Sequence, residues 1–282
     1  MKKKYFFVFL LFILTVVFLG FGGPLDKDIT ISLELKQVEN LSPLSLKYVF
    51  YINITNSSSR TYVLTRYRYR FVVEEKEYLQ LYTAPSGGLE LKAYGKTMIA
   101  IPVKITYEFL FQAIEEVRKK DTASCYLMGE LFFGDGRRER GSLPIAFSGE
   151  FPIFKIPEVE ILSLHANTVS IGGADLDLKV KLVNSNGFDL WVDDVVYNLK
   201  LGGYTVDGGR IEGDKDVKKK EEKIFSLHLL INFFDVGKDV YSILQKSEVN
   251  VSFSGEIEFR TDWGRMKIPF AEAQKIPLSR AD

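Results

Sequence analysis

Apolar and polar residues alternate along most of the chain, with the two-residue period of strands that bury one face. Clear examples span residues 29–35, 99–105, 225–233 and 249–259. Pro102 lies inside the second run and cannot donate to a strand ladder, so we predict an edge strand or a bulge there. Clusters of Gly, Ser, Asn and Asp divide the runs, as turns do. The pattern predicts a mostly antiparallel β protein.

Two segments instead have apolar residues at the three- and four-residue spacing of a helix with one buried face. They span residues 108–119 and 235–246. Asp235 is in position to cap the second segment. Because each segment follows a predicted strand at the corresponding place, we predict one short helix in each half of the chain.

The chain repeats itself at a nearly constant spacing. Residues 129–131 (Gly-Glu-Leu) recur as residues 255–257 (Gly-Glu-Ile), and residues 54–57 (Ile-Thr-Asn-Ser) recur as residues 182–185 (Leu-Val-Asn-Ser). Several segments in one order at one spacing indicate a duplicated domain. The two copies meet at Pro157.

The repeat divides the chain into three parts. Residues 1–23 precede the copies, residues 24–156 form the first domain, and residues 157–282 form the second. The spacing of the predicted strands in each copy is typical of a β-sandwich. The sequence therefore predicts two tandem antiparallel sandwiches without a flexible linker.

The N-terminal segment has the pattern of an export signal. Lys2, Lys3 and Lys4 precede an apolar run over residues 5–19, and small glycines follow it. This pattern is typical of a signal peptide. The alternative is an uncleaved, apolar transmembrane helix, since residues 5–23 approach the ~20 residues that span a bilayer. Both place the rest of the chain outside the cytoplasm, in the periplasm, in the cell envelope or beyond it.

Composition and charge argue against several functional classes. Lys plus Arg and Asp plus Glu number 37 each, so the chain lacks the basic excess typical of nucleic-acid binders. Its single cysteine, Cys125, rules out an internal disulfide framework and a cluster of thiolate metal ligands. We expect partners to be the membrane, through an uncleaved N-terminal segment, and a lipid or an envelope protein, and not nucleic acid.

Residues with catalytic chemistry are scarce. His165 and His228 lie in strand patterns at positions that point away from the core. No nucleophile elbow, phosphate loop or metalloprotease motif is present in the sequence. The aspartates between residues 175 and 194 match no ion-wrapping loop. We therefore predict no enzyme activity, no catalytic residues, no cofactor and no metal.

One basic stripe is a candidate contact site. Arg66, Arg68 and Arg70 alternate with Tyr67 and Tyr69, so the three guanidinium groups are predicted on one face of a strand. The favoured interpretation is a solvated outer face over an aromatic core. The alternative is a contact with anionic lipid head groups.

The second copy resembles the late embryogenesis abundant type 2 family, also called the water stress and hypersensitive response domain. Residues 178–186 (Leu-Lys-Val-Lys-Leu-Val-Asn-Ser-Asn) are similar to the family's strand that ends in an Asn-Pro-Asn turn. The match covers residues 157–278, with Ser185 where the family prefers Pro. The first copy matches more loosely, and Asn56-Ser57-Ser58 lacks the second Asn of the turn.

The resemblance implies immunoglobulin- or fibronectin-III-like sandwiches with a helix at one end. It also implies a non-enzymatic role linked to desiccation and stress tolerance, and for some relatives a role in lipid binding or transfer is proposed. The leading hypothesis is therefore a structural or stress-protective protein outside the cytoplasm. The alternative is a protein of the cell envelope that binds or transfers a lipid or another apolar ligand, for which the many aromatic residues would line a pocket.

Overall fold

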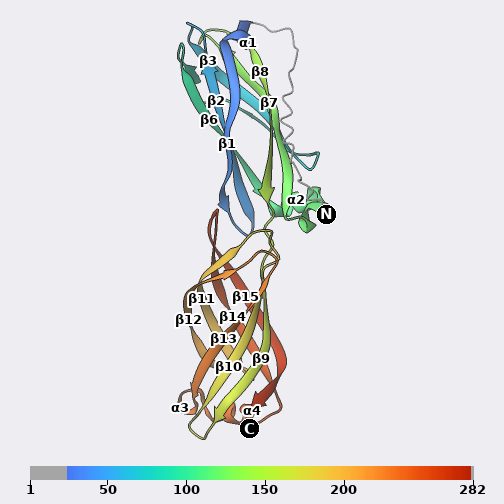
Figure 1. Ribbon diagram of the computed structural model, residues 1–282, viewed down its shortest axis with the longest axis vertical. Coiled ribbons are helices and arrows are strands. Elements are labelled where there is room, and N and C mark those ends of the chain that lie inside the picture. The colour runs from blue at the N-terminus through green and yellow to red at the C-terminus, as the bar shows by residue number, and fades with distance from the viewer. Residues whose placement is uncertain (1–23, 281–282) are drawn as a thin grey trace, which may run out of the picture.

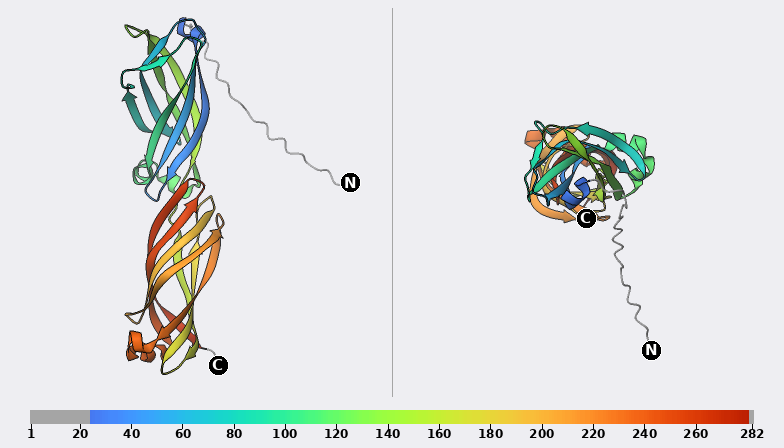
Figure 2. Two further views of the ribbon diagram at one scale, coloured as in Figure 1. Left: turned by 90° about the vertical axis from the view of Figure 1, so that its left-hand side faces the viewer. Right: turned by 90° about the horizontal axis from the view of Figure 1, so that it is seen from above.

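A computed structural model describes residues 24–280, apart from the side chains of residues 24, 210–214, 236 and 238. The predicted signal peptide or anchor of residues 1–23 lies outside the described residues. The protein is mostly β, as predicted, and consists of several sheets whose pairings are antiparallel with one exception. Its strands form two groups stacked end to end in an elongated molecule (Figure 1). Figure 2 shows the same arrangement from the side.

The first group, which we call the N-terminal half, contains two sheets. A three-stranded sheet has the order β1-β2-β6, and a second sheet has the order β4-β3-β7-β8 with β5 paired to β3. Pro102 lies in β6, at the edge of its sheet, as the missing N–H donor requires. The strands are β1 (Ile29–Leu41), β2 (Ser45–Asn56), β3 (Tyr62–Val73), β4 (Lys76–Thr83), β5 (Leu89–Leu91), β6 (Lys96–Thr106), β7 (Thr122–Gly134) and β8 (Glu139–Pro152).

The second group, the C-terminal half, is one curled sheet of seven strands. Its order is β12-β11-β14-β15-β9-β10-β13, and the pairing of β15 with β9 is parallel. The two ends of this order, β12 and β13, are consecutive in sequence and are not paired as neighbours in the sheet. The strands are β9 (Glu158–Val169), β10 (Gly173–Val183), β11 (Leu190–Leu201), β12 (Tyr204–Val217), β13 (Glu222–Asn232), β14 (Glu248–Thr261) and β15 (Gly264–Arg280).

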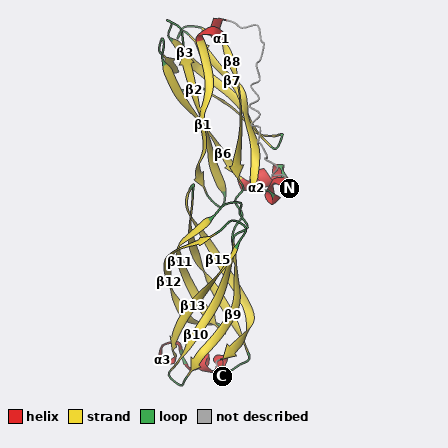
Figure 3. Cartoon of the chain, in the orientation of Figure 1, coloured by secondary structure: helices red, strands yellow, loops and turns green. Residues whose placement is uncertain are grey.

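Helices are short and lie at the ends of the two halves (Figure 3). The first predicted helix is α2 (Tyr107–Ala113) with a 3₁₀ turn over Glu115–Lys119, and the second is divided into α3 (Phe233–Val236) and α4 (Lys238–Leu244). A further helix, α1 (Pro24–Asp28), precedes β1. None of these helices, which include all those in residues 24–280, is long and apolar enough to cross a membrane.

The predicted cap of the second helical segment is wrong. Asp235 lies inside α3, whereas Asn232 is its N-cap and accepts a hydrogen bond from the backbone N–H of Phe234. The segment then breaks at Gly237, whose φ of 95° is outside the helical region. Periodicity continues across this break, which is why the sequence predicts a single helix.

Two buried asparagines show the repeat at atomic level. Asn56 ends β2 and Asn184 follows β10, and both side chains are fully buried. Each Nδ2 donates to one carbonyl oxygen in the adjoining turn and to two more beyond the next hairpin, at 2.6–3.2 Å. The acceptors are Arg60, Leu91 and Lys92 for Asn56, and Phe188, Val217 and Lys218 for Asn184.

The two halves meet through a dense joint. The backbone N–H and C=O of Lys155 bond the side chain of Asn186 at 2.7 and 2.8 Å. The Asp121 carboxylate accepts from the ammonium groups of Lys155 and Lys220, and these hydrogen bonds lower its pKa. The ring of Phe188 has its centre 6.4 Å from that of Phe154 across the joint, and it packs edge-on against Trp263 within the C-terminal half. These contacts link residues that precede Pro157 to residues that follow it.

Candidate functional site

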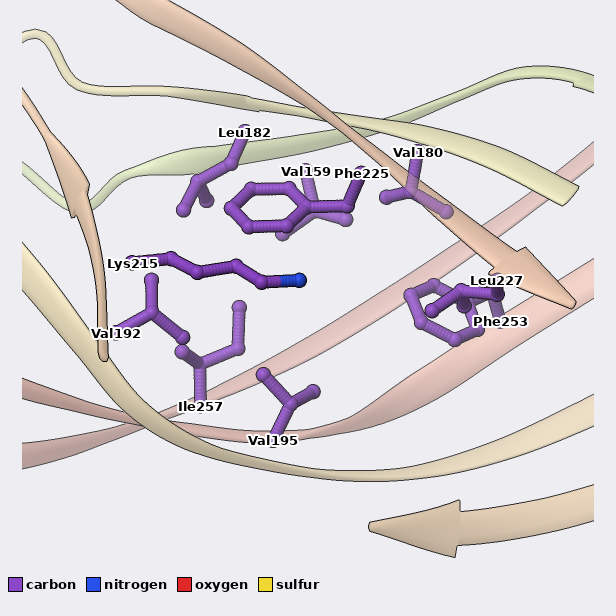
Figure 4. A pocket seen from close by; sticks show the side chains of 10 residues that line it. All are labelled: Val159, Val180, Leu182, Val192, Val195, Lys215, Phe225, Leu227, Phe253 and Ile257. Carbon is purple, nitrogen blue, oxygen red and sulfur yellow. The ribbon is translucent and has the colours of Figure 1, made fainter. Parts of the chain in front are cut away.

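An apolar cavity lies between the layers of the C-terminal half. Its volume is about 50 Å³, several times the roughly 10–15 Å³ that one water needs. Figure 4 shows the side chains that surround it. Those used below come from five strands and are Val180, Val192, Val195, Lys215, Phe225 and Ile257.

Strand alternation explains why the cavity is apolar. Inward-facing positions of β10, β11 and β14 carry Val180, Val192 and Ile257, each at most 6% exposed. Outward-facing positions on the same strands are polar or exposed, such as Val196 with half of its surface accessible. A space lined almost entirely by apolar side chains offers a water molecule few hydrogen-bond partners, so it favours an apolar occupant.

Lys215 is the polar residue at this cavity. It lies on β12 opposite Val192 of β11, and its Nζ is 5.2 Å from the centre of the Phe225 ring on β13. Figure 4 shows its stem crossing between Phe225 on one side and Ile257 on the other. Lysine commonly packs its methylene stem on apolar groups in this way while its charged end reaches solvent, and a cation–π contact adds to that packing.

Larger side chains occupy the corresponding places in the N-terminal half. Tyr67 pairs with Leu131 just as Val195 pairs with Ile257, so Tyr67 corresponds to Val195. Tyr67 and Leu89 both pack against the core. Leu89 corresponds to Lys215 of β12.

This correspondence follows from the strand register. Leu64 of β3 pairs with Leu89 of β5, and Val192 of β11 pairs with Lys215 of β12. A bulge follows Leu64 in the first pair of strands and Val192 in the second. The strand register is therefore the same in the two halves. The C-terminal half has a small residue, Val195, and a cation, Lys215, where the N-terminal half has Tyr67 and Leu89.

The predicted arginine stripe faces outward on β3. Arg66 donates from Nε and a terminal nitrogen to both carboxylate oxygens of Glu139 at 2.9 Å, which raises its pKa. Arg68 donates to Glu130 at 2.8 and 3.1 Å. Arg70 is exposed. Because carboxylates balance two of the three charges, most of the stripe is an ion-paired outer surface, and a contact with anionic lipid stays a prediction.

Both histidines lie on the outer face of the C-terminal half, as predicted. His165 Nδ1 is 2.8 Å from the Ser279 hydroxyl oxygen. His228 Nδ1 is 3.0 Å from a carboxylate oxygen of Asp177 and 3.4 Å from one of Asp175. The hydrogen bond to Asp177 and the charge of Asp175 raise the pKa of His228. The sheet separates this cluster from the cavity.

Other candidate chemistry is limited in the part of the chain that the structure describes. Within it, no group of three or more His, Cys, Asp or Glu side chains is arranged to hold a metal ion. Cys125 is buried, and burial raises the pKa of its thiol to about 12. The aspartates between residues 175 and 194 take part in separate hydrogen bonds and ion pairs, such as the ion pair of Asp193 with Arg260.

Comparison with known proteins supplies no family. No protein-family model and no curated protein matches the chain. A crystal structure of an Archaeoglobus fulgidus protein is 11% identical with a TM-score of 0.33, over 45% of this chain and 97% of that one. A solution structure of an Arabidopsis thaliana protein is 14% identical with a TM-score of 0.37, over 46% and 87%. Red sea bream transglutaminase is 10% identical with a TM-score of 0.30, over 89% and 31%. Similarities this distant show neither a family nor a function for the chain.

Proposed function

We propose that the protein is a non-catalytic binding protein outside the cytoplasm, and that its C-terminal half takes an apolar group into the cavity between its layers. The cavity carries this proposal. An enclosed apolar space with one polar group at its opening is the common form of a small-molecule site. The same place in the N-terminal half is occupied by Tyr67 and Leu89, so the framework itself does not require a space there.

Access to the cavity is through the edge of the sheet. Lys215 on β12 and Phe225 on β13 both line it, and these strands are not sheet neighbours. Their ends are joined by the turn over residues 218–221, where the Glu221 N–H donates to the Lys218 carbonyl at 3.2 Å. Because no ladder of backbone bonds has to break between them, β12 and β13 can separate to admit a ligand.

The test uses the filled half as a template. Val195→Tyr places the tyrosine of the N-terminal half into the cavity, and Val196→Tyr makes the same change on the outer face of the same strand. Calorimetric titration with decanol, a neutral ligand with a single chain, should show binding to the wild type and to Val196→Tyr, and none to Val195→Tyr. Absence of decanol binding by the wild type, or unchanged binding by folded Val195→Tyr, would contradict the proposal.

A second cavity-filling substitution tests the proposal if Val195→Tyr does not fold. Val192→Leu introduces the residue that the N-terminal half has at that place, Leu64, and adds one methylene to the lining. It should weaken decanol binding while leaving the circular dichroism spectrum unchanged. Equal affinity of this folded variant and the wild type would also count against the cavity as the site.

The second candidate function is the structural or stress-protective role that the family resemblance implies. The packing of Tyr67 and Leu89 against the core of the N-terminal half and the matching hydrogen bonds of Asn56 and Asn184 favour a supporting role for the framework. We further propose that the halves are two tandem immunoglobulin-like sandwiches divided at Pro157. Deletion of the gene should reduce survival after drying, and unchanged survival would contradict the protective role.

A further inference from the structure

The charge at the mouth of the cavity has no partner among the side chains that the structure describes. Other lysines around this edge are paired: Lys218 lies 2.9 Å from Asp216, Lys223 lies 3.3 Å from the same carboxylate, and Lys181 lies 2.6 Å from Glu160. Lys215, by contrast, contacts the ring of Phe225 and no carboxylate among the described side chains. An ammonium group at the edge of an apolar space can pair with the anionic head group of a ligand whose chain enters that space, and the exposure of Lys215 keeps the gain small.

The duplicated framework does not require this lysine. The corresponding Leu89 of β5 packs against the core of the N-terminal half. The framework thus accepts an apolar residue at this place, and the cation coincides with the half in which the space is open. We take the coincidence of an open space and a positive charge to reflect one ligand with an apolar part and an anionic part.

We propose that the C-terminal cavity binds a single-chain amphiphile with an anionic head group, its chain between the layers and its head group at Lys215 Nζ. The proposal rests on the proposed function and adds the class of ligand. A space of about 50 Å³ holds only a few methylene groups of one chain, so a longer chain requires separation of β12 from β13. The positive charge selects a carboxylate or a phosphate over a neutral head group.

The experiment compares three ligands with one chain length. Decanoate, decyl phosphate and decanol are titrated calorimetrically, below their aggregation limits, into the full chain and its variants. For the wild type we expect about fivefold tighter binding of at least one anion than of decanol, the size of a partly exposed ion pair. Preference for decanoate identifies a carboxylate ligand, and preference for decyl phosphate identifies a phosphate ligand.

The variants assign the preference to one residue. Lys215→Leu removes the charge and should bind the two anions no more tightly than it binds decanol. Lys179→Leu removes an exposed lysine from β10 and should keep the preference for the anion. If Lys215→Leu does not fold or no longer binds decanol, Lys215→Gln provides the same comparison with a polar residue.

The outcomes separate this proposal from the one on which it rests. Equal affinity of the wild type for the anions and decanol, or a preference that survives in Lys215→Leu, would overturn the head-group assignment and leave the apolar site standing. Failure of the wild type to bind any of the three ligands would overturn both.

Discussion

Replacing Asn184 by alanine should destabilise the C-terminal half strongly. Its Nδ2 donates to three carbonyl oxygens at 2.9–3.1 Å, and its Oδ1 accepts from the backbone and side-chain nitrogens of Asn186 at 3.0 Å. The side chain is fully buried, so water cannot easily replace it. The amide has two N–H groups to share among the three acceptors, so two donated and two accepted bonds are counted. At about 0.5–1.5 kcal/mol each, they give a loss of roughly 2–6 kcal/mol. Such a loss is a large part of the usual stability of about 5–15 kcal/mol.

Tryptophan fluorescence during urea unfolding measures this effect selectively, because both tryptophans, Trp191 and Trp263, lie in the C-terminal half. The control is Asn198→Ala, which changes an exposed asparagine on β11 and should alter the free energy of unfolding by less than about 0.5 kcal/mol. Equal effects of the Asn184 and Asn198 variants would refute the reasoning that the buried hydrogen bonds of Asn184 hold the hairpin in place.

Three further predictions follow from single residues. Gly129→Ala should lower the free energy of unfolding by about 2 kcal/mol in urea titrations, because the new Cβ would lie 2.1 Å from a carbonyl oxygen of β3, whereas Gly172→Ala, with its nearest atom at 3.9 Å, should change it little. Cys125, with its raised thiol pKa, should react with dithionitrobenzoate only as the protein opens, and immediate reaction of the native protein would contradict this. The raised pKa of His228 contributes stability that is complete below the unfolded-state pKa and is lost as pH rises through the folded value. NMR titration should show a lower pKa for His228 in Asp177→Asn, and equal values would contradict the assigned cause.

The strands could be predicted from the sequence because alternation and the repeat are local signals. The sequence did not show whether the turn after β2 has the same hydrogen bonds as the turn after β10. Its sequence lacks the second Asn of the family turn, yet the N–H and hydroxyl of Ser58 donate to Asn56 Oδ1 at 3.1 and 2.8 Å. In the second copy the two nitrogens of Asn186 donate to Asn184 in the same way. A hydroxyl replaces an amide here, and only the geometry shows that the two are equivalent.

The cavity could not be predicted from the sequence, because its volume depends on how side chains from several strands fill one space. A signal was nevertheless present. When the two copies are aligned, Val195 corresponds to Tyr67 and Lys215 corresponds to Leu89. Hairpins of unequal length shift the repeat spacing between these two pairs, so the comparison needs the strand register. The arginine stripe shows the opposite case: its outward direction was predictable, whereas its carboxylate partners on other strands were not.

The unequal filling of the two copies has a consequence for how the protein responds to compression. Internal voids disappear when a chain unfolds, so hydrostatic pressure favours the unfolded state of whichever part encloses more empty space. Tyr67 and Leu89 pack against the core of one copy, and the corresponding place in the other copy has a cavity. Under pressure the copy that carries both tryptophans is therefore expected to unfold first, and a ligand bound in the cavity would stabilise it.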